Sequence, residues 1–291
     1  MESSSDDMKA QRQSETAPTI AIVIATYNGA ATLDACLDSL AAQRTPVDEV
    51  VVQDGGSRDA TVDILKRRAE QLTYWTSVKD NGIYDAWNKA LDHVTADWIW
   101  FLGCDDNLAE PDTVRWLKSV LADIPSDVGL VYTRVAMVTA AGVVSEVIGR
   151  PWEETQRTMR YRMSVPHTGL LARRELFTTI GGFDSAYRIA GDYEWFTRAA
   201  QHSGVRFFPT TTVMAGDAGL SGGAATQVAT VREFGKVCDT QGRPKPLAWH
   251  WLHATAVMKV RLQKLFGPRV QSLLVDGYRV LTLRRRRGAA R

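Results

Sequence analysis

Cysteine is scarce in this chain of 291 residues, and its few copies form no familiar framework. The three cysteines are Cys36, Cys104 and Cys238. An odd number at these spacings matches neither a disulfide scaffold nor a zinc site. We therefore expect a protein of the reducing cytoplasm. With 45% apolar residues, the chain can bury a hydrophobic core of ordinary size.

Long apolar segments are also absent. Lys259, Arg261 and Lys264 interrupt the most apolar C-terminal segment, so no stretch reaches the about 18 uninterrupted apolar residues of a membrane-spanning helix. Residues 1–17 are polar, carry both signs of charge and lack the apolar run of a signal peptide. We expect a disordered leader there, no export signal and no crossing of a bilayer.

Acidic residues are nearly missing from the C-terminal part. Residues 243–291 contain twelve Lys and Arg and a single acid, Asp276, which gives a local balance of +11. Because the whole chain carries +2, residues 1–242 carry −9. An acidic body with a basic, Trp-containing end predicts contact with an anionic partner, either a membrane surface or nucleic acid.

Short apolar runs alternate with helical periodicity in the first hundred residues. Strands are predicted at 19–25, 50–52, 74–78 and 98–102. Apolar residues at helical spacing follow the first two strands, and 83–91 is a third predicted helix. Strands alternating with helices favour an α/β fold, with a mostly parallel, Rossmann-like sheet flanked by helices.

The pattern loosens after residue 108. We predict a hairpin around 140–142, a helix ending at Gly181 and Gly182, a helix opened by Asp192, a strand pair within 205–214 and a Gly-rich loop over 217–223. Helical spacing returns from about residue 227. The predicted division is a leader (1–17), a main domain (18–224) with halves 18–108 and 109–224, and a helical basic extension (225–291).

Polar residues gather where the predicted strands end, which is where parallel sheets bind ligands. Thr26, Tyr27 and Asn28 follow the first strand, Asp54 the second, and Asp105 with Asp106 the fourth. Adjacent carboxylates after an apolar strand suit Mg²⁺ or Mn²⁺. A solvated turn with a helix cap is the other interpretation of that pair. Asp54 precedes two glycines, and either accepts hydrogen bonds from a nucleobase or ribose or forms an ordinary turn.

Taken together and in order, these motifs resemble those of family 2 glycosyltransferases of the GT-A fold. The resemblance extends over residues 19–221. It is carried by Ala25-Thr-Tyr-Asn28, the Asp54 turn, Asn81-Gly-Ile-Tyr-Asp-Ala-Trp-Asn-Lys89 and Phe101-Leu-Gly-Cys-Asp-Asp106. Within the family, the chain is similar to the enzymes of bacterial O-antigen and exopolysaccharide assembly.

The resemblance implies a role for each matching residue. Thr26, Tyr27, Asn28 and Asp54 would hold the base and ribose of a nucleoside diphosphate. Asp105 would reach the ribose or phosphate, and Asp106 would ligate Mn²⁺ or Mg²⁺, with Asp105 and His167 as further metal candidates. Asp192 falls where the family has its catalytic base. The family motif there commonly has Glu-Asp, whereas this chain has Gly191-Asp192.

Three further sequence features each allow a functional and a structural interpretation. His167, in Pro166-His-Thr-Gly169, lies in a segment that the family uses near the acceptor and the diphosphate, or is a structural histidine. Ser221 belongs to a loop that closes over the donor phosphates, or to an ordinary turn. The arginines at 157, 160 and 162 meet an acceptor phosphate or face solvent.

The resemblance implies an inverting, hexosyltransferase-type enzyme that transfers a sugar from a UDP-sugar or similar donor to a lipid-linked saccharide, at the inner face of the plasma membrane. A sugar nucleotidyltransferase is an alternative, although Thr26-Tyr27-Asn28 stands where such enzymes have a Gly-rich loop. A nucleic-acid-binding protein led by Arg284–Arg287 is the other. The acidic body of the chain disfavours this alternative, so no nucleic-acid partner is expected.

Overall fold

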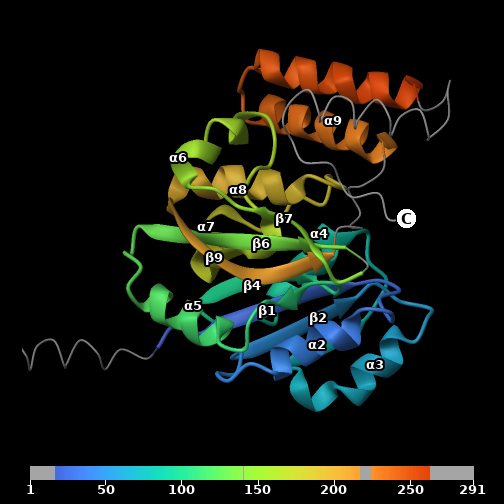
Figure 1. The fold of residues 1–291 in the computed structure, drawn as a ribbon, viewed down its shortest axis with the longest axis vertical. Helices are drawn as coiled ribbons and strands as arrows, with labels where there is room; N and C mark the ends of the chain where they lie inside the picture. Colours follow the sequence, from blue (N-terminus) through green and yellow to red (C-terminus); the bar gives the residue numbers. More distant parts are fainter. Residues whose placement is uncertain (1–16, 140, 217–223, 263–291) are drawn as a thin grey trace, which may run out of the picture.

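The computed structural model describes residues 17–139, 141–216 and 224–262 (Figure 1). Its first part alternates strands and helices as predicted. The strands are β1 (Ile20–Thr26), β2 (Glu49–Asp54), β3 (Tyr74–Ser77) and β4 (Trp98–Gly103), and the helices between them are α2 (Leu33–Ala41), α3 (Thr61–Arg67), the short η1 (Ala69–Gln71) and α4 (Ile83–Leu91). The predicted helix 83–91 coincides with α4, and the predicted strand boundaries differ from the observed ones by at most two residues.

The later part adds short strands and the helices that cover them. The strands are β5 (Asn107–Leu108), β6 (Val128–Val138), β7 (Val144–Ile148), β8 (Leu170–Arg173) and β9 (Gly204–Gly216). The helices are α5 (Thr113–Ala122), α6 (Trp152–Thr155), η2 (Thr158–Arg160), η3 (His167–Gly169), α7 (Arg174–Ile180), α8 (Gly191–His202) and α9 (Ala224–Thr240). A further helix covers 247–262. The hairpin joining β6 to β7 and the end of α7 before Gly181 are both as predicted.

The strands form one mixed sheet within the described residues. Its order is β3-β2-β1-β4-β8-β6-β9-β5, with β7 paired to β6. The strands β3, β2, β1 and β4 are parallel neighbours, whereas β8 runs antiparallel to both β4 and β6. The α/β prediction is confirmed, and the parallel order is confined to the N-terminal half and the β6–β9 pair.

Side chains alternate along β1 between two apolar layers. Ile20, Ile22 and Ile24 belong to the cluster that packs against α2, α3 and α5. Ala21 and Val23 belong to the cluster that packs against α4, α7, α8 and α9. The sheet is therefore covered on both faces, with α2 and α3 below it and α8 and α9 above it in Figure 1.

The predicted strand pair within 205–214 is wrong. The structure has one strand there, β9, which pairs with β6 along most of its length. Phe207 pairs with Tyr132, but the next pair is Thr211 with Arg134. Pro209 lies in the skipped stretch, and proline has no backbone N–H to donate. The ladder is interrupted at this point without the chain turning back.

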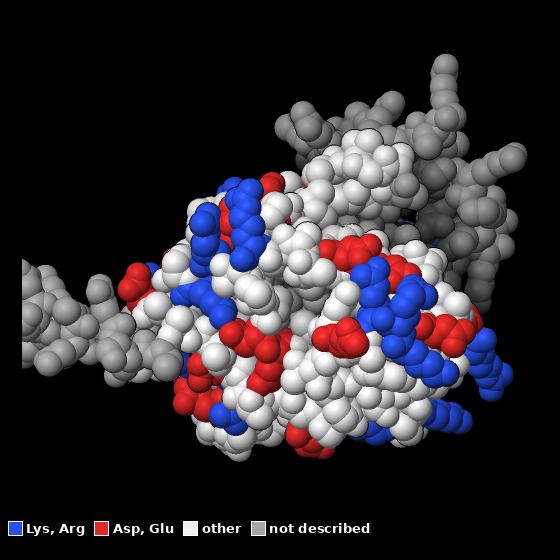
Figure 2. Space-filling view, turned by 90° about the horizontal axis from the view of Figure 1, so that it is seen from below, with Lys and Arg blue, Asp and Glu red and all other residues white. Residues whose placement is uncertain are grey.

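The face that α2 and α3 cover carries both signs of charge. Figure 2 shows acidic and basic side chains interspersed over it. Arg67 and Arg68 pair with Asp34 at 2.5 and 3.0 Å, and Arg68 also pairs with Asp38 at 2.6 Å. This face therefore offers no single-sign patch. Over the described ranges, we find no helix with the length and apolar character required to traverse a membrane.

Candidate functional site

The polar residues that follow β1, β2 and β4 meet at one edge of the sheet, as predicted. β1 lies between β2 and β4, with Thr26 opposite Asp54 and Ala25 opposite Gly103. Since the three strands are parallel, their carboxyl ends open on the same side. The structure thus brings together the loops that carry Thr26, Asp54 and Asp105.

Asp54 is fully buried and its carboxylate is occupied by its own surroundings. It accepts hydrogen bonds from the backbone N–H of Gly56 and Ser57, at 3.1 and 2.9 Å, and from the Ser57 and Ser77 hydroxyls. Four donors account for most of the hydrogen-bonding capacity of a carboxylate. In this structure Asp54 holds the loop after β2 against the end of β3.

The three residues after β1 have different surroundings. Asn28 has a φ of 52°, its side-chain oxygen accepts the Arg58 N–H at 2.9 Å and its own N–H donates to Ser57 Oγ at 2.7 Å, which ties this loop to the next one. Tyr27 is 60% exposed. The Thr26 hydroxyl is buried without a partner among the described residues. Tyr27 and Thr26 therefore keep free capacity, whereas Asn28 is bound to the scaffold.

Asp105 and Asp106 lie in contrasting environments. Asp105 is exposed, whereas Asp106 is 3% exposed and accepts the Gly103 N–H at 2.7 Å. Burial raises the pKa of Asp106 to about 7; the Gly103 hydrogen bond opposes this shift and the Asp105 charge adds to it. A side chain at Gly103 would place its Cβ 2.6 Å from an Asp105 oxygen and 3.1 Å from an Asp106 oxygen. Glycine at this position leaves the space that both carboxylates use, a need that the sequence pattern did not reveal.

Asp192 lies in the first turn of α8, as predicted, with Tyr84 and His167 beside it. The Tyr84 hydroxyl is 3.2 Å from Asp192 Oδ1 and 2.7 Å from the Ile189 carbonyl oxygen. His167 Nδ1 is 3.9 Å from Asp192 Oδ2. A Cβ on Gly191 would lie 2.7 Å from the Tyr84 ring. The departure from Glu-Asp to Gly191-Asp192 therefore has a steric reason, because the Tyr84 ring occupies the space of a side chain there.

His167 packs against the rings of Trp87 and Phe101, and its ring nitrogens make no hydrogen bond to other described residues. Its ring stacks on Trp87, with centroids 4.7 Å apart, and lies 6.0 Å from the Phe101 ring. Both ring nitrogens are buried and make no hydrogen bond within the described residues. Burial lowers the pKa of His167, while the Asp192 charge opposes the shift. A neutral imidazole with unused donor and acceptor capacity suits a polar ligand beside Asp192.

Contacts from α9 fix the backbone that leads into Asp192. The Glu233 carboxylate accepts the N–H groups of Arg188, Ile189 and Ala190 at 3.0, 2.9 and 2.7 Å. These residues directly precede α8, whose first-turn N–H groups have no intrahelical partner. Glu233 therefore holds the start of α8 in place, and no sequence motif indicated that role.

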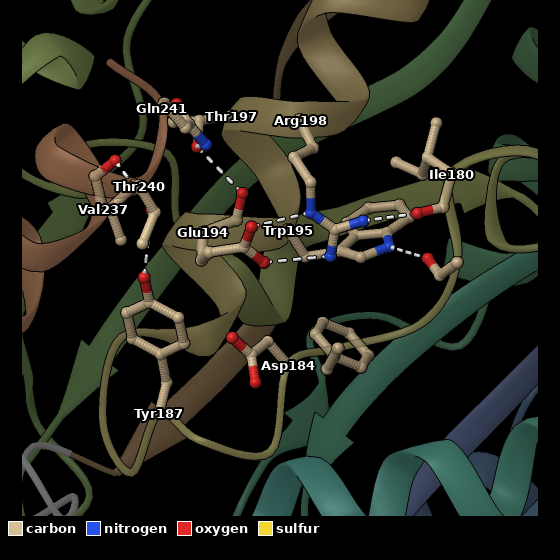
Figure 3. A network of polar contacts seen from close by, with 12 residues as sticks. Ile180, Asp184, Tyr187, Glu194, Trp195, Thr197, Arg198, Val237, Thr240 and Gln241 are labelled. Atoms are coloured by element: carbon tan, nitrogen blue, oxygen red, sulfur yellow. Dashed lines mark hydrogen bonds and ion pairs between the residues drawn. The ribbon is translucent and has the colours of Figure 1, made fainter. Parts of the chain in front are cut away.

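A second network holds α8 against the end of α7 (Figure 3). Arg198 pairs with both Glu194 oxygens, at 2.7 and 2.9 Å, and donates to the Ile180 and Gly182 carbonyls. Trp195 donates to the Gly181 carbonyl at 3.0 Å. Side chains of α8 thereby satisfy the carbonyl of Ile180, the last residue of α7, and those of the two glycines that follow it. The helix that carries Asp192 is braced at both sides.

The remaining predicted site residues are not brought into one metal cluster. No trio of His, Cys, Asp and Glu side chains in the described ranges is arranged to hold a metal, so Asp105, Asp106 and His167 do not form a three-ligand set. Ser221, with its Gly-rich loop, lies outside the described residues, as do the leader 1–16 and the basic run at 284–287. Asp105 and Asp192 are nevertheless both linked to β4. Asp105 follows the strand directly, and Asp192 lies beside His167, which packs against Phe101 of that strand.

Comparison with known proteins decides the family. The model of the family described as "Glycosyl transferase family 2" matches residues 21–177, which is more than half of the chain. This chain belongs to glycosyltransferase family 2. The match contains the strand-end loops, α4 and His167, while Asp192 and Glu233 lie beyond its end. Membership identifies the chain as a glycosyltransferase, the first of the activities that the sequence suggested.

A curated relative supports this assignment. The "PGL/p-HBAD biosynthesis glycosyltransferase" of Mycobacterium bovis is 36% identical over 186 residues, which cover 62% of this chain and 70% of that protein.

Solved structures show the GT-A fold. The mannosyltransferase PcManGT of Pyrobaculum calidifontis, in complex with GDP-Man and Mn²⁺, has a TM-score of 0.62 at 22% identity and covers 91% of this chain and 81% of its own. S. aureus TarS 1-349, in complex with UDP-GlcNAc, has a TM-score of 0.58 at 17% identity, with 82% and 71% covered. The chain spans 39% of the longer TarS chain.

Proposed function

We propose that this glycosyltransferase is an inverting, divalent-cation-dependent enzyme that transfers a sugar from a UDP-sugar to a lipid-linked saccharide in cell-surface polysaccharide biosynthesis. The observation that carries the proposal is that Asp105 directly follows β4 and that Asp192 lies beside His167, which packs on Phe101 of the same strand. One site suits the diphosphate end of a donor, and the other suits the proton of an acceptor.

The proposal of a nucleotide-sugar donor is supported by the sheet edge at which β1, β2 and β4 end. Tyr27 presents an exposed ring, and rings of this kind stack on nucleobases. The UDP-GlcNAc and GDP-Man bound to the two similar structures support a nucleotide sugar. The division into a nucleotide-binding half (18–108) and an acceptor half (109–224) stays a prediction.

The residues at the end of β4 fit a Mg²⁺ or Mn²⁺ ion. Such ions usually bind through one or two carboxylates and complete their shell with substrate phosphates and water, so no third protein ligand is needed. Of the two carboxylates, we propose Asp105 as the principal ligand in place of Asp106, because Asp105 is exposed and Asp106 is buried against Gly103. The ion would neutralise the charge that develops on the leaving diphosphate.

Asp192 is proposed as the catalytic base. A direct displacement at the anomeric carbon inverts its configuration and requires a group that takes the proton of the acceptor hydroxyl. The Tyr84 hydroxyl orients Asp192 Oδ1, and His167 lies on the side of Oδ2 with free ring nitrogens. The acceptor hydroxyl would bind between Asp192 and His167.

The lipid-linked acceptor and the location at the inner face of the plasma membrane rest on the sequence resemblance together with the basic composition of residues 243–291. An O-antigen-type product and the donor nucleotide rest on the sequence resemblance.

A thermal-unfolding screen of nucleotide sugars with and without Mn²⁺ tests the donor. A ligand that binds only the native state stabilises it by about 2.7 kcal/mol at a concentration 100-fold above its Kd. We expect UDP-sugars with Mn²⁺ to raise the Tm most, and nucleoside triphosphates to raise it less. A larger shift with a GDP-sugar would replace UDP in the proposal, and stabilisation that ignores Mn²⁺ would contradict the proposed metal dependence.

A further inference from the structure

The helix over 247–262 packs one face on α9 through Trp249. The two helices lie side by side at the end of the molecule opposite α3 (Figure 1). The Trp249 indole donates to the Val231 carbonyl at 2.8 Å, and a Cβ on Gly235 would lie 2.6 Å from the same ring. Ala256, 5% exposed, is buried in this contact as well. The helix is therefore attached to the catalytic domain by its inner face.

The opposite face of the same helix exposes large apolar side chains. Leu247, Trp251 and Met258 are 87%, 57% and 55% exposed. Their spacing of four and seven residues places them on one side of a helix, and the small, exposed Ala254 lies between them. Apolar side chains in such a row mark an interaction site more often than single exposed ones do.

The surroundings of this row are basic. Residues 243–262 contain no acidic residue, and Lys259 and Arg261 belong to the same helix as the row. Two Arg243 nitrogens are buried and Lys245 pairs with Asp239 at 2.6 Å, so these two cations do not contribute to the exposed charge. A cavity of about 490 Å³ adjoins the start of the helix, and its lining contains Arg157, Arg160 and Pro246 but no carboxylate. Pro246 directly precedes the exposed Leu247, so the cavity and the apolar row meet at this end of the helix.

The exposed face of the 247–262 helix combines positive charge with apolar side chains, and its partner must accommodate both. A second copy of this chain would bring Lys259 and Arg261 of both copies toward one interface, and like charges disfavour such pairing. Nucleic acid would attract the basic groups but would leave Trp251 and Met258 without an apolar environment. An anionic lipid surface provides both, since it has phosphate groups outside and acyl chains just below them.

We propose that the outer face of the 247–262 helix, with the Arg157–Arg160 cavity beside it, docks the enzyme on an anionic lipid surface. Trp251 and Met258 enter the boundary between headgroups and acyl chains, and the basic groups contact lipid phosphates. The proposal deepens the lipid-linked acceptor proposed above. Its test measures binding to vesicles without sugar transfer, so either proposal can fail while the other holds.

Co-sedimentation of the full chain with vesicles tests the docking surface. We expect binding to phosphatidylglycerol–phosphatidylcholine vesicles at low ionic strength, weaker binding at high salt and little binding to phosphatidylcholine alone. The double variant Trp251→Ser/Met258→Ser should bind at least about tenfold more weakly, because two large side chains no longer enter the lipid. Trp251→Phe should retain most of the binding.

A matched control comes from β7, which also exposes apolar side chains. Val144 and Val147 are 47% and 49% exposed, but Glu146 lies between them. Val144→Ser/Val147→Ser should leave vesicle binding unchanged. Unchanged binding by the Trp251/Met258 double variant, or an equal loss in the β7 control, would overturn the proposal.

Two further measurements separate the other partners and the role of the cavity. If sedimentation equilibrium shows a dimer that the Trp251/Met258 double variant dissociates while vesicle binding is unchanged, the face belongs to a second copy and the proposal is wrong. Arg157→Ala/Arg160→Ala should weaken binding to phosphatidylglycerol vesicles severalfold and leave UDP binding intact. Unchanged vesicle binding would remove the cavity from the docking surface.

Discussion

The loops after β1 and β2 differ from the neighbourhood of Asp192 in how their polar groups are satisfied. Asp54 accepts four hydrogen bonds, and Asn28 joins the two loops through two more. Around Asp192, by contrast, both His167 nitrogens are buried and make no hydrogen bond within the described residues. In the first region Asp54 and Asn28 hold the loops in shape, and Thr26 and Tyr27 keep free capacity. In the second region the unused capacity lies directly beside the carboxylate of Asp192.

This difference fits two tasks, with the strand-end loops positioning the nucleotide and the surroundings of Asp192 serving proton transfer. A loop that holds a nucleotide must keep its shape before the nucleotide binds, so internal hydrogen bonds are an advantage there. A base must reach an acceptor proton, so its surroundings must leave room for the acceptor. If the comparison is correct, substitutions near Asp192 affect turnover, and substitutions at the strand ends affect binding or folding.

The largest effect is expected for Asp192→Asn. The amide keeps the size of the side chain but cannot take the acceptor proton, so kcat should fall by about 10² or more, the usual scale for a general base. Donor affinity should stay near that of the wild-type enzyme. Steady-state kinetics with a UDP-sugar, together with calorimetric titration of UDP, separate the two quantities.

Tyr84→Phe is the matched comparison for this variant. It removes the hydroxyl that lies 2.7 Å from the Ile189 carbonyl oxygen and 3.2 Å from Asp192 Oδ1, and it leaves the ring against Gly191. We therefore expect kcat to fall by a smaller factor, in line with a net value of about 1 kcal/mol for one hydrogen bond. Normal turnover of Asp192→Asn would show that another group is the base.

The second-largest effect is expected on the Mn²⁺ dependence of UDP binding, and it distinguishes Asp105 from Asp106. Asp105→Asn should reduce the gain in UDP affinity that Mn²⁺ provides by at least about tenfold, since even loss of an indirect partner of a metal ligand costs that much. Asp106→Asn should reduce it less, because the amide oxygen can still accept the Gly103 N–H and burial already raises the pKa of Asp106 to about 7. Titration of UDP at several Mn²⁺ concentrations measures both.

The opposite ranking would restore the assignment that the sequence suggested. If Asp106→Asn abolishes the Mn²⁺ effect while Asp105→Asn preserves it, Asp106 is the ligand and the loop after β4 must rearrange when the ion binds.

The smallest effect concerns the pH dependence of stability. Burial lowers the pKa of His167 in the folded protein below its ordinary value of 6.5. As the pH falls through that value, the unfolded chain takes up the proton first, so the free energy of unfolding decreases toward acid and is fully recovered above it. His167→Gln should reduce this decrease. Urea denaturation at a series of pH values measures it, and an identical pH profile in the variant would mean that folding does not shift the pKa of His167.

The sequence predicted the first half of the fold well because its signals are local. Apolar runs end within two residues of the ends of β1, β2 and β4, and the helix 83–91 coincides with α4. The family and the strand-end residues could be predicted because each motif consists of residues that are close together in the sequence. β9 was mispredicted as two strands because Pro209 interrupts the pattern, while pairing with β6 keeps the chain extended across it.

Tertiary structure alone decided which polar groups remain free for a ligand. Asp105 and Asp106 are neighbours with the same side chain, and only the packing around Gly103 exposes one and buries the other. Asp192 meets Tyr84 and His167 across separations of 108 and 25 residues in the chain, and Glu233 of α9 fixes the backbone before it. Local sequence determined the strands and loops, because these depend on the spacing of nearby residues. Burial and hydrogen-bond partners depend on segments that meet only after folding.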